Sequence, residues 1–186
     1  MQQKEYLARV LQGASRMGAL IQDLLAYSQV GREGRGQTAV DLRTAVDQAL
    51  VTFRHSRNTP EFQIDIAPDL PKVIGDPTHL VSVFHNLISN ALKYRRMDLQ
   101  TEVRIWSELT PEGEWTISVQ DNGIGIAPAY QRQIFEPFKR LHGSEIPGNG
   151  IGLAVCRRIV QAHGGQLWVE SEVGAGSTFR MTLRAG

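Results

Sequence analysis

One predicted helix constrains the possible fold of this sequence most, because one of its faces is apolar and another is polar. The pair Asp76-Pro77 marks its start, with aspartate as N-cap and proline in the first turn, and the helix is expected to run over Thr78–Arg96. Apolar side chains recur on one face at the spacing of a buried stripe: Leu80, Val83, Phe84, Leu87, Ile88 and Ala91. Such a stripe requires a second layer of structure to cover it.

Another face of the same helix is polar. At about 100° per residue, one stripe collects His79, Ser82, Asn86, Asn90 and Lys93. Mg²⁺ keeps most of its waters and takes few protein oxygens, while a lysine ammonium acts on phosphates as a point charge. The stripe therefore suits a Mg²⁺-bound polyphosphate, and an ordinary solvated face is the alternative that this helix alone leaves open.

Two glycine-rich loops lie at junctions between predicted elements. DNGIGI (Asp121–Ile126) follows the strand pattern WTISVQ, and its glycines allow a positive φ or a close backbone approach. At the mouth of this loop Asp121 can accept a hydrogen bond from an exocyclic amine such as that of adenine, although Asp-Asn-Gly is also a common turn. GNGIGL (Gly148–Leu153) opens a helix whose first N–H groups would face phosphate.

Between these loops lies IFEPF (Ile134–Phe138). Its two phenylalanines are either plain core or the near anchor of a mobile loop over Lys139–Pro147, which holds several charges and few apolar side chains. A further glycine-rich segment, GAGSTF (Gly174–Phe179), precedes the last predicted strand.

The remaining pattern mixes helices and strands without regular alternation. Helices are expected over Leu42–Leu50 and Gly152–His163, the second ended by Gly164-Gly165. Strands are predicted at Phe62–Ile66, Glu102–Ser107, Trp115–Gln120, Gly165–Glu170 and Thr178–Leu183. The expected class is α+β, with helices layered on a mixed sheet.

Residues 4–30 follow a heptad, in which apolar side chains recur every three or four positions. The stripe is wide enough for a multi-helix bundle completed by other copies or another segment, and a simple core helix is the alternative. GREGRGQT, with three glycines and alternating charges, indicates a flexible linker. We therefore divide the chain into a helix over 1–31, a linker over 32–38 and a main domain over 39–186.

Composition argues against several classes of function. The net charge is +1, which disfavours nucleic acid or an acidic membrane surface as the main partner. Cys156 is the only cysteine, which excludes an intrachain disulfide and a cysteine-based metal cluster and fits a reducing cytoplasm. The apolar runs are far shorter than the roughly 20 residues that cross a bilayer. We expect a soluble, cytoplasmic chain without membrane contact of its own, whose parent protein is either soluble or membrane-anchored.

In order and spacing, five segments resemble the N, G1, F, G2 and G3 boxes of the histidine kinase catalytic domain. That domain belongs to the GHKL ATPase superfamily, which also contains DNA gyrase. The boxes are HNLISNALKY, DNGIGI, IFEPF, GNGIGLAVCRRIVQAHGG and GAGSTF, and the match covers about residues 40–184. Residues 4–30 also resemble the second helix of the family's dimerisation bundle, most of all in phytochrome-type kinases. The resemblance implies an α/β sandwich, a homodimer formed through the N-terminal helix, and a response regulator as partner.

The resemblance further implies ATP and Mg²⁺ as ligands. Asn90, helped by Asn86, would coordinate Mg²⁺, while Lys93 would reach the phosphates and Tyr94 would lie against the adenine. The implied ATP-binding residues lie in or beside the five boxes: Asn86, Asn90, Lys93, Tyr94, Asp121, Gly123, Gly125, Phe138, Gly148, Gly150, Ile151, Gly152, Leu153 and Thr178.

Within that set, the resemblance implies that residues of the G1 and G3 boxes bind the adenine base. Asp121 would read the adenine amine in a pocket shaped by Gly123 and Gly125, with Thr178 at its floor. The three glycines of the G2 box would let the mobile loop and the following helix approach the triphosphate.

The implied activity is transfer of the γ-phosphate of ATP to a histidine, yet no histidine of this chain has the family's acceptor context. That acceptor lies in the first bundle helix, followed by an acid and, at the fifth position, by proline. The closest pattern, His55-Ser56-Arg57-Asn58-Thr59-Pro60, has the proline but not the acid, and it lies within the main domain. No catalytic residue is therefore assigned. His163, beside Gly164, is interpreted as a helix C-terminal residue favoured by the dipole.

Two alternatives stay open. The superfamily's true ATPases carry a glutamate at the position of Asn86 to activate water, and an amide cannot act as a general base. His85 is next to it but lies off the Mg²⁺ face. This disfavours a dedicated hydrolase. A non-enzymatic nucleotide-binding or dimerisation module is the second alternative.

Overall fold

The computed structural model describes residues 37–54, 60–141 and 149–186, together with Gly18, Ile21 and Ser28, which are helical. The rest of the N-terminal heptad, the pattern around His55 and most of the predicted mobile loop, with Gly148, lie outside the described residues.

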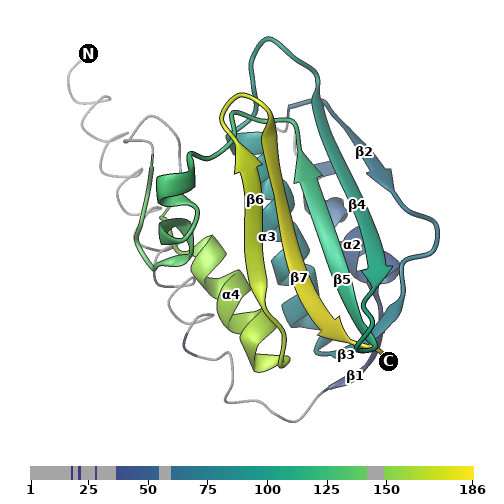
Figure 1. Cartoon of the computed structure of the whole chain (residues 1–186). Helices are drawn as coiled ribbons and strands as arrows, with labels where there is room; N and C mark the ends of the chain where they lie inside the picture. The colour runs from purple at the N-terminus through teal and green to yellow at the C-terminus, as the bar shows by residue number, and fades with distance from the viewer. Residues whose placement is uncertain (1–17, 19–20, 22–27, 29–36, 55–59, 142–148) are drawn as a thin grey trace.

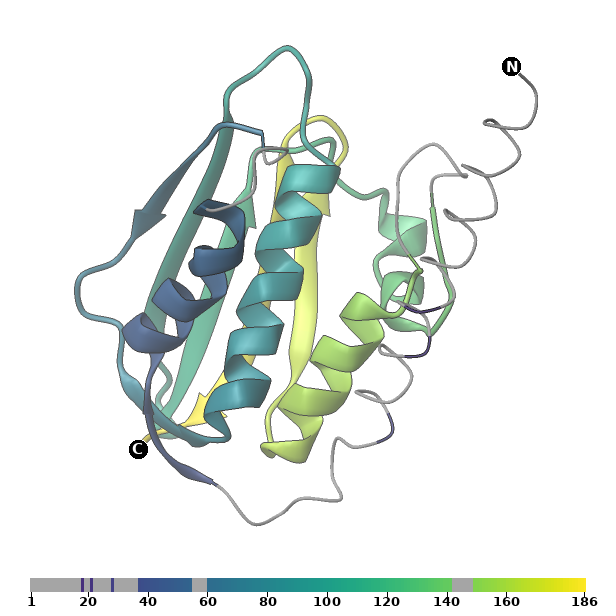
Figure 2. The ribbon, with the colours of Figure 1, turned by 180° about the vertical axis from the view of Figure 1, so that it is seen from behind.

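Five strands form one mixed sheet, and three helices cover one of its faces (Figures 1 and 2). The strand order is β2 (Phe62–Ile66), β4 (Thr101–Leu109), β5 (Glu114–Asp121), β7 (Gly176–Arg184) and β6 (Leu167–Glu172). β2 and β4 are parallel, and each of the other neighbouring pairs is antiparallel. The helices are α2 (Leu42–Arg54), α3 (Pro77–Lys93) and α4 (Gly152–Ala162). The predicted α+β class and the α/β sandwich are confirmed.

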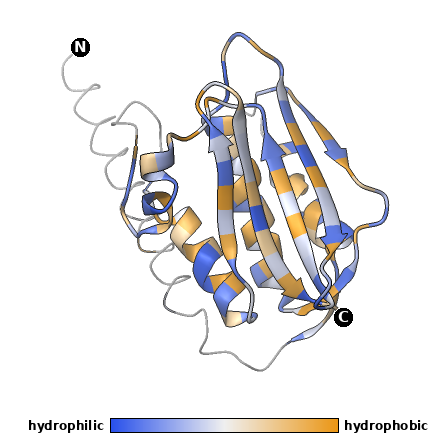
Figure 3. Cartoon of the chain, viewed as in Figure 1, coloured by the Kyte–Doolittle hydropathy of each residue, from blue (hydrophilic) through white to orange (hydrophobic). Residues whose placement is uncertain are grey.

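The core lies between the helices and the sheet. α3 is the central helix in Figure 2, and its predicted apolar stripe is buried, from Leu80 to Ala91. Buried side chains of the strands, such as Ile105, Ile117 and Met181, complete the core from the sheet side. The opposite face of the sheet carries many hydrophilic residues in Figure 3. One polar and one apolar face per strand is the pattern expected of a sheet covered on a single side.

A second, two-stranded sheet was not predicted. It pairs β1 (Thr38–Asp41) with β3 (Lys72–Gly75) in antiparallel fashion, and Val73 also bridges to Ala185. Between β5 and α4 lie two short 3₁₀ helices, η1 (Pro128–Tyr130) and η2 (Gln133–Phe135).

Several boundaries differ from the prediction, among them the end of α2 at Arg54 rather than Leu50, and in two places tertiary contacts explain the difference. α3 stops at Lys93 rather than near Arg96, since the Tyr94 carbonyl accepts a hydrogen bond from Ile124 N–H at 3.0 Å. β6 begins at Leu167 rather than Gly165. The N–H of Gly165 instead donates to the Val160 carbonyl at 3.0 Å and closes the C-terminal end of α4.

Candidate functional site

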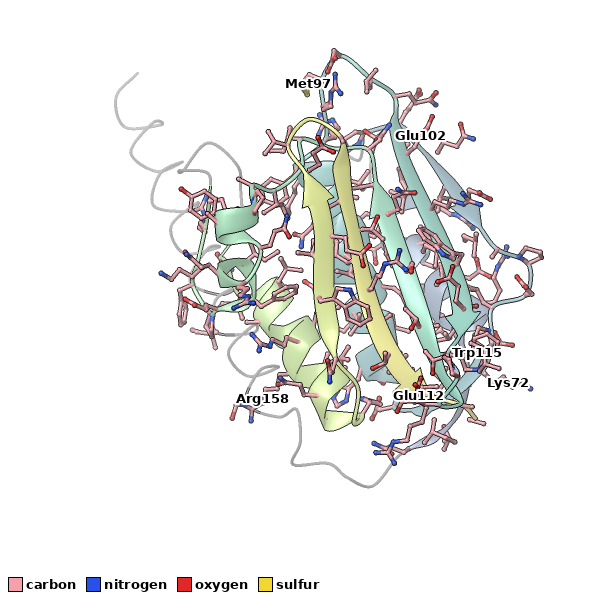
Figure 4. All side chains as sticks on the ribbon, viewed as in Figure 1. Lys72, Met97, Glu102, Glu112, Trp115 and Arg158 are labelled. Atoms are coloured by element: carbon pink, nitrogen blue, oxygen red, sulfur yellow. The ribbon has the colours of Figure 1, made fainter. Side chains whose placement is uncertain are left out.

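The predicted site residues gather at the end of the sheet where β5 and α3 end. Figure 4 marks this end by Met97 and Glu102, and the opposite end by Lys72 and Trp115. Asn122 fixes the DNGIGI loop there, because its Oδ1 accepts a hydrogen bond from Glu102 N–H at 2.9 Å.

Asp121 ends β5 and opens the loop. Its Oδ1 accepts a hydrogen bond from Gly123 N–H at 2.8 Å, and Asp121 pairs with Ser177 of β7 across the sheet. Burial raises the pKa of Asp121 to about 6, although the backbone N–H groups of Gly123 and Ser177 act to lower it. The site therefore contains a largely buried carboxyl group. Shielded from water, it can accept a hydrogen bond from the amine of a bound ligand.

The glycines of this loop are required by close packing. A Cβ at Gly123 would lie 2.5 Å from the Tyr94 carbonyl oxygen, and one at Gly125, where φ is +71°, would lie 1.9 Å from the Glu172 carbonyl oxygen. The loop is thus held between the end of α3 and the β6–β7 turn. The predicted need for positive φ or close approach is confirmed at these positions.

Asn86 on α3 faces the N-terminal end of α4. Its Nδ2 donates to the Ser82 carbonyl at 2.9 Å, which leaves Oδ1 as the oxygen available to another partner. A Cβ at Gly152 would lie 2.6 Å from that oxygen. Asn90, one turn later on α3, is half-buried, and its side chain makes no hydrogen bond to the part of the chain that the structure describes. Lys93 is exposed.

The N-terminus of α4 has no side-chain cap. Its N-cap residue is Ile151, which is buried, and Leu153 is half-buried. Gly150, with φ +70°, accepts a hydrogen bond from Phe138 N–H at 2.9 Å. The N–H groups of the first turn of a helix have no partner within the helix, so such an end can bind an anion.

The two phenylalanines of IFEPF differ. Phe135 is buried and contacts Phe179 edge to face at 6.5 Å between ring centroids, so it is core. Phe138 is 57% exposed, with φ 65°, and its backbone N–H pairs with Gly150. The aromatic side chain of Phe138 is thus available at the surface.

Tyr94 and Thr178 complete the described part of the site. Tyr94 is half-buried, and burial raises the pKa of its hydroxyl, an effect that the nearby charge of Arg140 opposes. Thr178 is buried on β7, next to Ser177 and paired with Gln120 of β5. Both residues therefore adjoin the elements that hold Asp121.

His163 lies at the C-terminal end of α4 as expected, but the interpretation through the dipole was wrong. Its Nε2 accepts a hydrogen bond from Asp76 N–H at 2.9 Å, and its Nδ1 donates to the Ile159 carbonyl at 2.7 Å. An amide N–H only donates and a carbonyl only accepts, so the ring is neutral in this arrangement. The dipole favours a cation, and this ring carries no charge.

His85 faces another layer than Asn86. Its ring stacks on Phe53 of α2, with centroids 4.9 Å apart and planes 19° apart, whereas Asn86 faces α4. Burial, and then the charge of Lys93, lower the pKa of His85. The imidazole thus lies on another face of α3 than Asn86.

Sequence reasoning missed Ser171, Ser177 and Gln131, whose hydrogen bonds join the loop to the β6–β7 hairpin. Small polar residues in a strand or a short turn give no periodic signal. In the described ranges, no helix is long and apolar enough to cross a membrane.

The family model described as "Histidine kinase-, DNA gyrase B-, and HSP90-like ATPase" matches residues 75–186. Phytochrome-like protein Cph1 of Synechocystis sp. is 37% identical over 98% of this chain and 24% of its own length. Cyanobacterial phytochrome A of Nostoc sp. is 40% identical over the same shares, 98% and 24%. The chain thus spans about a quarter of these relatives.

Solved structures of sensor kinases resemble this chain in fold. The mycobacterial sensor histidine kinase MprB is 29% identical with a TM-score of 0.65, over 81% of this chain and 99% of that one. Full-length ShkA, solved in complex with AMPPNP, shares the fold at 23% identity and a TM-score of 0.77, over 100% of this chain and 40% of that one. This chain therefore belongs to the family of histidine kinase-, DNA gyrase B- and HSP90-like ATPases, in the form found in sensor histidine kinases.

Proposed function

We propose that this chain binds Mg²⁺-ATP and is the ATP-binding catalytic part of a longer sensor histidine kinase. Residues 39–186 are the ATP-binding domain, 32–38 the linker and 1–31 the second helix of a bundle that forms a homodimer. A segment outside this chain supplies the acceptor histidine. A response regulator is the partner that receives the signal, and this part of the protein works in the cytoplasm.

One observation carries the proposal: a buried carboxyl group, a helix face with two amides and an uncapped helix N-terminus meet at one end of the sheet. Asp121 supplies the carboxyl group. Asn86 brings the amide face of α3 against the first turn of α4, because a Cβ added at Gly152 would lie only 2.6 Å from Asn86 Oδ1. Adenine, Mg²⁺ and phosphate each require one of these features.

The residues divide the nucleotide among them. Asp121 accepts a hydrogen bond from the adenine amine, in the pocket formed by Gly123, Gly125 and Tyr94, with Thr178 beneath. Asn90 and Asn86 hold Mg²⁺ through their amide oxygens, and Lys93 faces the phosphates. The first turn of α4, with the G2-box positions Gly148, Gly150, Ile151, Gly152 and Leu153, lies against the triphosphate, and Phe138 borders it.

The donor set fits Mg²⁺, which takes few protein oxygens, and the ion neutralises charge on the phosphates when bound. In the transfer, an imidazole nitrogen of the acceptor forms a bond to the γ-phosphorus while the bond to the β,γ-bridging oxygen breaks and ADP leaves. This chain's part is to place the γ-phosphate in line with the acceptor and to exclude competing water.

Hydrolysis is disfavoured by the same geometry. Asn86 occupies the place where a water-activating acid would be needed, and its Nδ2 already donates to Ser82. His85, the imidazole next to it in the sequence, stacks on Phe53 of α2 instead. The remaining alternative is a module that binds nucleotide without transfer, and the labelling experiment in the Discussion separates the two.

Calorimetric titration with ATP, ADP and GTP, with and without Mg²⁺, tests the binding proposal. We expect ATP and ADP to bind, GTP to bind much more weakly, and ATP affinity to fall without Mg²⁺. Asp121→Ala should weaken ATP binding by about 1–3 kcal/mol, or roughly 10- to 100-fold, because the adenine amine loses its acceptor. Asp98→Ala, at an exposed carboxylate paired with Arg96, is the control and should bind normally. Equal affinity for ATP and GTP would contradict the role of Asp121.

A further inference from the structure

We propose that Ser171 is a positioning residue that sets the conformation of the base-reading loop, Asp121–Ile126, and thereby the preference for adenine over guanine. The inference rests on the proposed function, since it assigns base recognition to that loop. Ser171 lies on β6, directly across from Ser177 of β7.

The Ser171 hydroxyl uses its full hydrogen-bonding capacity. It donates to the Gly176 carbonyl at 2.7 Å and accepts from Ile126 N–H at 2.8 Å. Its third contact is with the Ser177 hydroxyl at 2.9 Å. A hydroxyl has one proton and two lone pairs, and the carbonyl already takes the proton. The Ser177 hydroxyl is therefore the donor in the third bond, and removal of the Ser171 hydroxyl would break all three bonds.

Through these bonds one hydroxyl holds both ends of the loop. It binds the Ile126 end directly, through the backbone N–H. It reaches the Asp121 end through Ser177, whose side chain it binds and which pairs directly with Asp121 across β5 and β7. A shift of Ser177 relative to β6 would therefore move the carboxyl group that reads the base.

Gln131 adds a third anchor to the same point. Its Nε2 donates to the Ser171 carbonyl at 2.7 Å and to the Ile126 carbonyl at 3.1 Å. Gln131 follows η1 directly, so the network joins the base-reading loop to the segment that leads to Phe138. Loop, hairpin and 3₁₀ helices are thus fixed relative to one another at Ser171.

The test compares ATP and GTP, which contact both the base and phosphate parts of the site, with inorganic tripolyphosphate, which contacts only the phosphate part. Ser171→Ala should reduce the ratio of the GTP and ATP dissociation constants about tenfold, because Asp121 loses its fixed position. Affinity for inorganic tripolyphosphate with Mg²⁺, which lacks a base, should stay unchanged. A purely structural role would alter stability and leave the GTP to ATP ratio as it was.

Thr182 offers a matched control in the same hairpin. Its hydroxyl accepts a hydrogen bond from Gln166 N–H at 2.9 Å. It lies one residue before Leu183, the partner of Trp115, and hence at the far end of the sheet in Figure 4. Thr182→Val should lower stability without changing the nucleotide ratio. Ser171→Thr restores the hydroxyl on a residue suited to a strand and should restore the ratio.

The outcomes separate the two proposals. A wild-type chain without preference for ATP over GTP would remove base reading itself, and the proposed function would fail at Asp121. A wild-type preference that Ser171→Ala leaves intact would overturn the role of Ser171 alone. If Ser171→Ala does not fold, Ser171→Cys decides, because it keeps the volume but bonds weakly. A wild-type ratio in Ser171→Cys would then reject the inference.

Discussion

Asp76 and His163 lie 87 positions apart in the sequence, yet the backbone N–H of Asp76 donates to Nε2 of His163 over 2.9 Å. The bond joins the N-terminus of α3 to the C-terminus of α4, and the carboxylate of Asp76 caps α3 at the same point. The candidate site lies at the other ends of these two helices, where Asn86 meets Gly152. One buried histidine thus holds together the helices that frame the site.

His163→Ala should destabilise the fold by about 2–4 kcal/mol, from the unpaired N–H of Asp76 and the cavity left by the ring. His163→Gln keeps an acceptor at a similar distance from the backbone and should lose clearly less. Urea unfolding of the three proteins, followed by circular dichroism, measures the difference. Equal losses for the two variants would show that the hydrogen bond to Asp76 contributes little.

The raised pKa of Asp121 predicts a pH-dependent stability in the absence of nucleotide. The folded chain binds this proton more tightly than the unfolded chain, whose aspartate has a pKa near 3.8. The stabilisation is therefore complete below pH 3.8 and is lost as the pH rises to about 6. A rise of two pKa units corresponds to about 3 kcal/mol.

Asp121→Asn stays neutral at every pH, so its stability relative to the wild type should increase by up to about 3 kcal/mol between pH 4 and pH 7. Urea unfolding of both proteins across this range tests the sign. Asp98→Asn, at an exposed carboxylate whose pKa Arg96 lowers, should show no such gain. A constant difference between Asp121→Asn and wild type would mean that the Asp121 carboxyl group is not desolvated.

Alanine substitutions at Gly125 and Gly113 distinguish the energetic cost of a positive φ from the cost of close packing. Both have a positive φ, +71° and +84°, but a Cβ at Gly113 meets nothing within 4 Å, whereas one at Gly125 overlaps the Glu172 carbonyl. Gly113→Ala should cost about 1–2 kcal/mol, the penalty of φ alone. Gly125→Ala should cost at least about 3 kcal/mol in unfolding free energy and should also weaken ATP binding. Similar losses for both would refute the close packing of the loop against β6.

Gly152→Ala should affect binding and stability in opposite directions. Gly152 is the first residue of α4, and replacing glycine by alanine there restricts the unfolded chain by about 0.4–1 kcal/mol, so the free energy of unfolding should be unchanged or higher. The new Cβ would displace Asn86 Oδ1, which lies 2.6 Å from its position, and affinity for Mg²⁺-ATP should fall about tenfold. Calorimetry and urea unfolding on one preparation test both. Normal Mg²⁺-ATP affinity would show that Asn86 does not bind the metal ion.

The elements that the sequence predicts well have local causes. Asp76 caps α3 by accepting hydrogen bonds from Thr78 N–H and His79 N–H at 2.8 and 3.1 Å, so the cap itself is made by neighbouring residues. β1 and β3 have four residues each and are stabilised by pairing across more than thirty positions. Strands this short contain too few positions for an alternating pattern to identify them.

The candidate site follows the same division. The need for glycine in DNGIGI could be predicted because such a loop after a strand requires positive φ or a close backbone approach, although the groups approached could not. The bonds from Ser171 to Ile126 and to Ser177 could not, because their partners are brought together only by the completed sheet. The neutral state of His163 was likewise hidden, since it depends on Asp76, a residue that no local pattern connects to it.

Phosphoryl transfer gives the last prediction. This chain, incubated with Mg²⁺-ATP labelled at the γ-phosphate, should acquire no acid-labile, base-stable label, because no described histidine can act as acceptor. His163 is buried and bonded at both nitrogens, and His85 is stacked on Phe53. His79, in the first turn of α3, packs edge to face against His163 with ring centroids 6.0 Å apart. Transfer requires the attacking nitrogen in line with the leaving oxygen, which a residue fixed in the same domain cannot reach.

Extending the chain upstream by the preceding segment of its own gene, which we expect to hold the acceptor histidine, should restore labelling. Replacing that histidine by glutamine should abolish the label and leave ATP affinity unchanged. Label on the unextended chain that disappears in His55→Ala would make His55 the acceptor. If the extended protein binds ATP but takes no label, the chain is a nucleotide-binding module without transfer, because bound ATP and the acceptor histidine would then both be present.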